Sequence, residues 1–306
     1  MRVGALVACA VSANAAIHYV TVAGLGGEAE YEQRFTTLAK DMDKVLRGSG
    51  GDNKVHTLTG GDATKQKLTE KLGEVAREAK ADDQFALFLI GHGTFDGSDY
   101  KFNLKGPDIT AIELAALCDR IPATRQLVVN ATSASGGSLH ALQKSNRAVI
   151  TATKAGTEKN ATVFPRYWVE ALRDTSSDTD KNEAISALEA FRYADQKVTN
   201  FFTTAKRLAT EHCVLEDTGY GEGSRTPGKD DNQGMAAARF AVVRIGSAQR
   251  AAADPTKRQL INRREELELE IDKLKLEKAA MPLDEYRKKL SKLLVDMAKV
   301  QEEIDK

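Results

Sequence analysis

Two short loops contain residues whose types and spacing could support catalysis. The first is Gly91-His92-Gly93, directly after an apolar run, and the second is the small-residue stretch 132–137, TSASGG. A histidine between glycines can approach a substrate closely, because neither neighbour has a side chain. A strand that runs into a small-residue turn can present a nucleophile beside backbone N–H donors. The residues predict His92 as a base and a nucleophile within 132–135, although glycine- and serine-rich turns also end ordinary strands.

A third stretch, residues 178–189, has the spacing of a twelve-residue EF-hand-type loop. The candidate ligands are Asp178, Asp180, Asn182, the backbone carbonyl of Ala184, Ser186 and Glu189. Hard oxygen donors at this spacing suit Ca²⁺, and we expect a structural rather than a catalytic site. Glu183 stands where the usual loop has glycine, which adds backbone strain. The alternative is a solvated acidic loop that caps the helix expected from about Ile185.

Apolar runs alternate with amphipathic segments from residue 17 onward, and they predict the elements that position these loops. The expected strands cover 17–23, 55–58, 85–90, 126–131, 148–153 and 239–245. One expected helix ends near residue 47, and the others cover 63–80, 110–120, 139–144, 166–173 and 185–210. Such alternation predicts an α/β fold, a mainly parallel doubly wound sheet with helices on both faces. Sites in such sheets form at the carboxyl ends of strands, where the two loops would lie.

Two segments, FLIGHG at 88–93 and LVVNATSASGG at 127–137, resemble the legumain-like (C13) cysteine peptidases of the caspase–hemoglobinase fold. In that family a strand leads into His-Gly, and the next core strand ends in a cysteine followed by a Ser-Gly turn. Residues 148–156 and 163–172 are similar to the strand and helix that follow the nucleophile there. The resemblance covers 17–250 and implies a caspase–hemoglobinase-like sheet with a cysteine endopeptidase site.

The chain departs from the pattern of that family where the chemistry would occur. His92 falls on the catalytic histidine, but Ala134 falls on the cysteine nucleophile, and about Gly26 falls on a supporting asparagine. Neither Cys118 nor Cys213 occupies a strand-end position that could substitute. Thiol peptidase chemistry needs a thiolate beside an imidazole. We therefore expect the chain as written to lack peptidase activity.

Three interpretations of the Ala134 position stay open. The chain is a natural pseudo-peptidase that binds a protein or peptide partner in its cleft, which we favour. Alternatively it is a hydrolase in which Ser133 or Ser135 acts with His92, although a one-residue shift at a strand end turns a side chain to the other face. In the third interpretation Ala134 replaces the cysteine of an active endopeptidase.

The composition changes after Pro255 to Glu, Lys, Leu and Arg, so we divide the chain into an α/β domain at 16–250 and a helical segment at 256–306. Apolar residues spaced three and four apart form two seams, Leu267, Ile271 and Leu274, then Leu283, Tyr286, Leu290, Leu293, Met297, Val300 and Ile304. This pattern predicts an antiparallel, coiled-coil-like hairpin. Its seams either bury each other or bind a partner or a second copy, as in a homo-oligomer.

Residues 1–15 have the outline of a secretory signal peptide. Arg2 precedes an apolar stretch at 3–11, and Ala13-Asn14-Ala15 fits a cleavage site. We expect export to the periplasm or the outside. Lipid attachment through Cys9 is the less favoured alternative, and no stretch is long and apolar enough to span a membrane.

The charges and cysteines exclude several function classes. The chain has 44 Lys+Arg against 44 Asp+Glu, whereas a nucleic-acid-binding protein normally has a basic excess. Three cysteines are too few for a disulfide-framed scaffold and lack zinc-ligand spacing. Whether Cys118 and Cys213 pair after export stays open at this point.

Overall fold

The computed structural model describes residues 16–228, 231–254 and 256–306, and its centre is a six-stranded sheet. The strand order is β2-β1-β3-β7-β8-β10. The strands are β1 (Ile17–Ala23), β2 (Lys54–Leu58), β3 (Gln84–Ile90), β7 (Arg125–Asn130), β8 (Arg147–Thr151) and β10 (Val214–Glu216). The first five are parallel, and β10 pairs antiparallel with β8 at the edge. The predicted signal peptide lies outside the described residues, so export stays a prediction.

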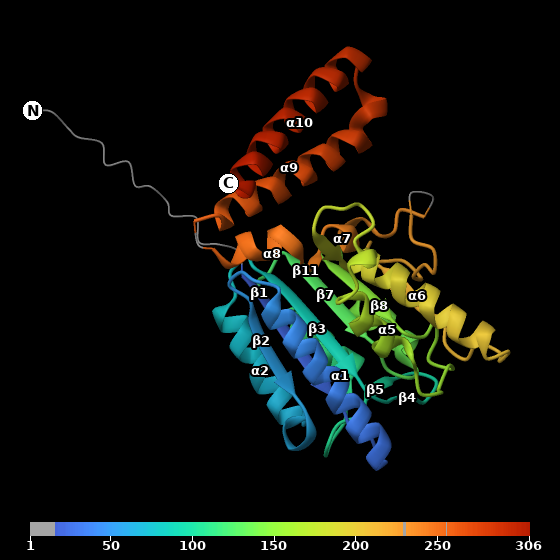
Figure 1. The fold of residues 1–306 in the computed structure, drawn as a ribbon. Helices are drawn as coiled ribbons and strands as arrows, with labels where there is room; N and C mark the ends of the chain where they lie inside the picture. Colours follow the sequence, from blue (N-terminus) through green and yellow to red (C-terminus); the bar gives the residue numbers. More distant parts are fainter. Residues whose placement is uncertain (1–15, 229–230, 255) are drawn as a thin grey trace, which may run out of the picture.

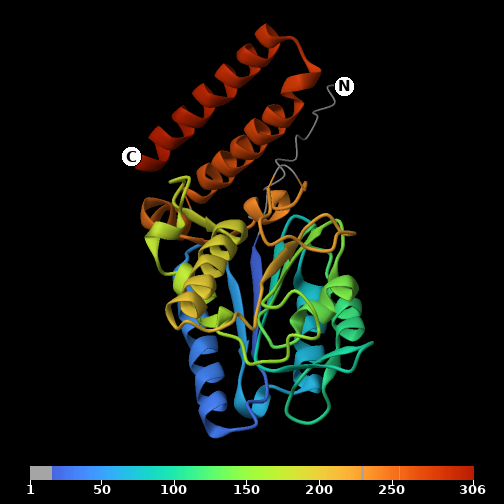
Figure 2. The same cartoon turned by 90° about the vertical axis from the view of Figure 1, so that its right-hand side faces the viewer.

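Helices cover both faces of this sheet, as the apolar strands require (Figure 2). One core joins Tyr19 and Phe88 to helices α1 (Ala29–Gly48), α5 (Phe164–Ala171) and α6 (Ala187–Thr204). The second core joins Val20 and Leu87, one residue along each strand, to the opposite helices. Those helices are α2 (Lys65–Glu78), α3 (Ala111–Cys118) and α4 (Leu139–Leu142).

Two smaller sheets lie outside the central one. The first is formed by β4 (Gly93–Phe95), β5 (Tyr100–Phe102) and β6 (Ile109–Thr110), directly after the His92 loop. The second pairs β9 (Ala184–Ser186) with β11 (Ala241–Arg244), so the strand expected at 239–245 does not extend the main sheet. Residues 185 and 186 lie in a strand rather than in the helix predicted at 185–210, because Ser186 caps α6, which begins at Ala187 and ends at Thr204.

The predicted C-terminal hairpin is present as α9 (Arg258–Glu277) and α10 (Leu283–Asp305). Leu267, Ile271 and Leu274 are buried, as the seam on α9 predicts. The hairpin also packs on α8 (Gly246–Ala253), where Ile261 and Ile304 join Ala248 and Ala251 in a small core. The α9 seam is therefore buried within the chain, whereas Leu283 at the start of the α10 seam is 52% exposed. None of the described helices could cross a lipid bilayer.

The predicted fold class is thus confirmed: a mainly parallel sheet with helices on both faces and a C-terminal helical hairpin. The hairpin lies at the end of the sheet where the parallel strands begin, and β4 and β5 lie at the opposite end (Figure 1). The two ends therefore present different surfaces, one built from strand-end loops and one shared with the hairpin.

Candidate functional site

The loops after β3 and β7 meet at the carboxyl ends of these neighbouring strands. The Gly93 N–H donates to Ser133 Oγ at 3.1 Å, and Ser133 Oγ donates to the Gly93 carbonyl at the same distance. A Cβ atom on Gly93 would lie 2.5 Å from the Ser133 carbonyl oxygen, so only glycine permits this approach. The structure therefore joins the predicted His92 loop to the predicted nucleophile turn.

His92 is partly buried against an aromatic pair on α1. The rings of Tyr31 and Phe35 lie 4.8 Å and 5.0 Å from the imidazole, both edge to face. Burial and the nearby charge of Arg34 lower the pKa of His92, and a hydrogen bond with the Gly26 backbone opposes them only in part. The imidazole is therefore held in its neutral form, which can accept a proton.

Ala134 is fully buried and has a left-handed backbone conformation, with φ 54° and ψ 13°. Its N–H donates to the Glu158 carbonyl at 2.7 Å. This conformation costs about 1 kcal/mol in a residue that is not glycine. Nucleophile-bearing turns between a strand and a helix are strained in a similar way. The turn shares a left-handed backbone with such elements, as do Lys181, Glu183, Lys206 and Asn232 elsewhere in the described chain, and its side chain is a methyl group.

The hydroxyls of Ser133 and Ser135 are both buried, and both make hydrogen bonds with neighbouring loops. Ser133 Oγ makes its two hydrogen bonds with Gly93. Ser135 Oγ accepts the Thr153 N–H at 3.1 Å and lies 3.2 Å from Thr153 Oγ1. Within the described residues neither hydroxyl is hydrogen-bonded to His92. In this arrangement both serines tie the loops together.

Three titratable side chains beside the turn, those of Glu158, Glu211 and His212, were not expected from the sequence. The Glu158 carboxylate pairs with the His212 imidazole, and the Glu158 carbonyl is the acceptor for Ala134. Glu211 is buried and accepts the Val163 N–H at 2.9 Å and 3.1 Å with its two oxygens. Burial raises the pKa of Glu211 to about 7. These residues are 48 and 54 positions from their partners, a separation that no local sequence pattern reports.

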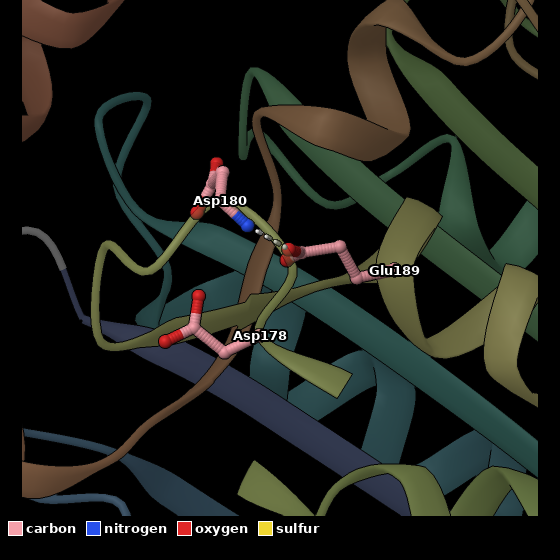
Figure 3. Close-up of side chains that lie close together, drawn as sticks. All are labelled: Asp178, Asp180 and Glu189. Atoms are coloured by element: carbon pink, nitrogen blue, oxygen red, sulfur yellow. Dashed lines mark hydrogen bonds between the residues drawn. The ribbon is translucent and has the colours of Figure 1, made fainter. Parts of the chain in front are cut away.

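The acidic loop brings together three of its six predicted ligands. One carboxylate oxygen from each of Asp178, Asp180 and Glu189 lies within 4.8 Å of the others (Figure 3). Burial raises the pKa of Asp180, and the negative charges of Glu189 and Asp178 add to that effect. A cation between the three groups would relieve this repulsion.

The other three predicted ligands take part in backbone structure. Asn182 Oδ1 accepts the Ala184 N–H at 2.8 Å, and Ala184 pairs with Arg244 in the β9–β11 sheet. Ser186 and Glu189 form a capping box at the start of α6, with Ser186 N–H donating to Glu189 Oε2 at 2.9 Å. The helix start is therefore capped by Ser186 and Glu189, and Asp178 is buried, which differs from the alternative of a solvated acidic loop at the helix start.

Glu183, at the usual glycine position of the loop, has a φ of 62°. Its carboxylate accepts the Ala248 N–H at 2.8 Å and a hydrogen bond from the Ser247 hydroxyl, both at the start of α8. The loop thus adopts the turn for which glycine is usual, and contacts with α8 hold the side chain that replaces it.

Cys118 and Cys213 are free and buried. Burial raises the pKa of the Cys118 thiol to about 11 and also raises that of Cys213. Both thiols are therefore protonated at neutral pH and unsuited to nucleophilic attack.

The comparisons with known proteins give similarity in structure only. No protein-family model matches the chain, and no curated protein does. Among solved structures, caspase-1 from Spodoptera frugiperda is similar at 13% identity and a TM-score of 0.45, covering 67% of this chain and 86% of that one. The Drosophila initiator caspase Dronc is similar at 11% identity and a TM-score of 0.43, covering 67% and 80%. A Geobacter sulfurreducens protein has 13% identity and a TM-score of 0.44, covering 60% and 89%. Likenesses at this level say nothing about activity.

Proposed function

We propose that this protein is an exported pseudo-peptidase of legumain-like type, which binds a protein or peptide partner near His92 without cleaving it. One observation carries the proposal. Ala134 occupies a buried, left-handed turn beside the His92 loop, which supports its assignment to the nucleophile position. The strain is retained although a methyl group has no chemistry to offer. Export rests only on the leader pattern at residues 1–15.

The chemistry of the surrounding groups supports binding rather than hydrolysis. A neutral His92 can accept a proton only from a nucleophile within hydrogen-bonding reach. The two nearby serine hydroxyls already donate or accept hydrogen bonds within the protein. The hairpin at 256–306 adds a second surface for a partner or another copy, and the exposed Leu283, Leu294 and Val295 of α10 lie on it.

A panel of fluorogenic peptides tests the proposal. We expect no turnover by the chain as written and measurable turnover after Ala134→Cys. In the Ala134→Cys background, His92→Ala should lower kcat/KM by about 10²–10⁴-fold, because the general base is lost. His140→Ala is the matched control, since His140 lies on the surface with 63% of its side chain exposed.

Two results of that panel would contradict the proposal. Turnover by the unmodified chain that disappears with His92→Ala would mean that a serine or another group is the nucleophile. Failure of the Ala134→Cys variant to cleave any peptide, with an unchanged melting temperature, would mean that the cleft does not keep peptidase geometry. Peptides cleaved by the variant should bind the unmodified chain intact, as measured by fluorescence polarisation.

We also propose that the loop at 178–189 holds a structural Ca²⁺ ion. The ligands would be Asp178, Asp180, Asn182, the Ala184 carbonyl, Ser186 and Glu189. The proximity of three carboxylates and the raised pKa of Asp180 support this proposal. Binding would require Glu189 and Ser186 to exchange part of their helix-capping hydrogen bonds for the metal.

Thermal unfolding with and without Ca²⁺ tests the metal proposal. With a dissociation constant of about 10⁻⁴ M, 2 mM Ca²⁺ should stabilise the fold by about 1.8 kcal/mol. Asp180→Asn should abolish this response and raise the stability of the calcium-free protein, because it removes one of three clustered negative charges. Asp99→Asn, on an exposed turn, should respond like the parent. An equal calcium response in parent and Asp180→Asn would place the ion elsewhere.

A further inference from the structure

A cavity of about 470 Å³ lies between the C-terminal hairpin and the amino end of the sheet. Its domain side includes Gln84 and Arg125, the first residues of the paired strands β3 and β7. Its hairpin side includes residues of both α9 and α10. This volume falls in the range of small-molecule sites. The cavity is at the opposite end of the parallel strands from His92 and is separate from the proposed cleft.

Two arginines in this cavity have no acceptor within the part of the chain that the structure describes. Neither the Arg125 nor the Arg239 guanidinium takes part in a hydrogen bond or ion pair there, and Arg239 Nε is buried without a partner. The other cavity arginine, Arg264, is different, because it donates to the Asn182 carbonyl at 2.9 Å and to Gln301 Oε1 at 3.0 Å. Arg125 and Arg239 are therefore available to an anion that enters from outside.

The neighbouring carboxylates neutralise these two arginines only in part. The charge of Glu265 acts on Arg125 against the effect of burial, and Asp180, which also lines the cavity, is one of the proposed Ca²⁺ ligands. Glu265 accepts hydrogen bonds from Arg244 at 2.6 Å and 3.0 Å, and Glu268 lies 3.5 Å from Arg264. Burial lowers the pKa of Arg125, which reports that its charge lies in a poorly solvated place. An unpaired guanidinium in such a place favours a ligand with a negative group.

The α10 side of the cavity is apolar and is lined by Leu290, Leu294 and Met297. The α9 side adds Ile271 together with the charged residues Arg264, Glu265, Glu268 and Lys275. Leu294 is 43% exposed, so apolar surface remains in contact with water at the rim. A hydrocarbon chain would cover this surface while its charged end lies near the arginines.

We propose that this cavity binds a small anionic amphiphile, a carboxylate with a medium-length hydrocarbon chain. The carboxylate accepts hydrogen bonds from Arg125 and Arg239, and the chain lies along the α10 side chains. Because the walls belong to both the α/β domain and the hairpin, the ligand holds the two together.

Decanoate is the probe, and isothermal titration calorimetry of the full chain measures its binding. For a ligand of this size we expect a dissociation constant of about 0.1 mM. Acetate lacks the chain, and 1-decanol lacks the charge, so both should bind at least tenfold more weakly. Decyl phosphate distinguishes a carboxylate site from a general anion site, and tighter binding of the phosphate would overturn the assignment to a carboxylate.

Variants identify the position of the ligand. Arg125→Gln and Arg239→Gln should each weaken decanoate binding by about 10-fold or more, because each removes a charge-assisted hydrogen bond. Leu290→Ala should weaken decanoate but leave acetate unchanged. Arg173→Gln is the matched control, because Arg173 pairs with Asp41 on the surface, away from the cavity. No binding of decanoate by the folded parent, or equal binding by parent and both arginine variants with unchanged melting temperatures, would overturn the proposal.

Discussion

Replacing Gly136 with alanine is expected to lower the free energy of unfolding by about 3 kcal/mol, a cost typical of severe overpacking. A Cβ atom at this position would lie 2.2 Å from the Ala155 backbone nitrogen and 2.4 Å from the Lys154 carbonyl carbon. Both obstructing atoms belong to the backbone, so no side-chain rotation can relieve the clash. The Gly136 N–H is also held by Thr153 Oγ1 at 2.9 Å. Chemical denaturation monitored by circular dichroism measures the loss.

The same substitution at Gly61 is the matched control. A Cβ atom there would meet nothing within 4 Å, so Gly61→Ala should leave stability unchanged or raise it by up to about 1 kcal/mol. Because Gly136 follows the turn that holds Ala134, Gly136→Ala should also remove the turnover expected of Ala134→Cys. Equal stability of the Gly136→Ala and Gly61→Ala variants would mean that the loops after β7 and β8 do not pack as described.

Between pH 4.5 and 7, burial of Glu211 is expected to make the fold lose about 3 kcal/mol of stability as the pH rises. Burial raises the pKa of Glu211 from 4.5 to about 7, so the folded state binds a proton that the unfolded state has released. The stabilisation is complete below pH 4.5 and is lost as the pH rises through 7. Glu211→Gln resembles the protonated form, so its stability should exceed that of the parent at pH 8 and approach it at pH 4.5.

The difference between Glu211→Gln and the parent isolates this group from the others that titrate in the same range. Glu30→Gln is the control, because Glu30 is exposed in the first turn of α1 and makes no ion pair with the described residues, so its stability difference should vary little with pH. Urea denaturation at several pH values measures both differences. A Glu211→Gln difference that is constant from pH 5 to 8 would show that Glu211 is ionised throughout.

Much of the frame of the candidate site follows from local sequence patterns. Apolar runs such as 85–90 predict buried parallel strands because every side chain of such a strand meets a helix layer. The strand ends then place His92 and the 132–137 turn at one edge, since parallel strands end together. The sequence does not predict the β4–β6 sheet, because its strands are only two or three residues long and have no clear periodicity.

The geometry of the acidic loop at 178–189 could be predicted from the sequence only in part. Its spacing predicts clustered oxygens, because ligand positions within twelve residues are local in the chain, and three of them do approach. The contact between Glu183 and the start of α8 could not be predicted, since 64 residues separate Glu183 from Ser247. That contact stabilises the positive φ for which the sequence offered no glycine.

The sequence by itself determined the alternation of strands and helices, the two strand-end loops, the alanine at position 134 and the apolar seams of the hairpin. These features depend on residue type and short-range periodicity, which are visible in a linear chain. Three further features are visible only in the folded chain: Ser133 and Ser135 join neighbouring loops, Glu211 is buried beside the turn, and Arg125 and Arg239 have no acceptor among the described residues that line their shared cavity. Hydrogen bonding and burial depend on residues far apart in sequence, and the packing of the sheet and hairpin brings those residues together.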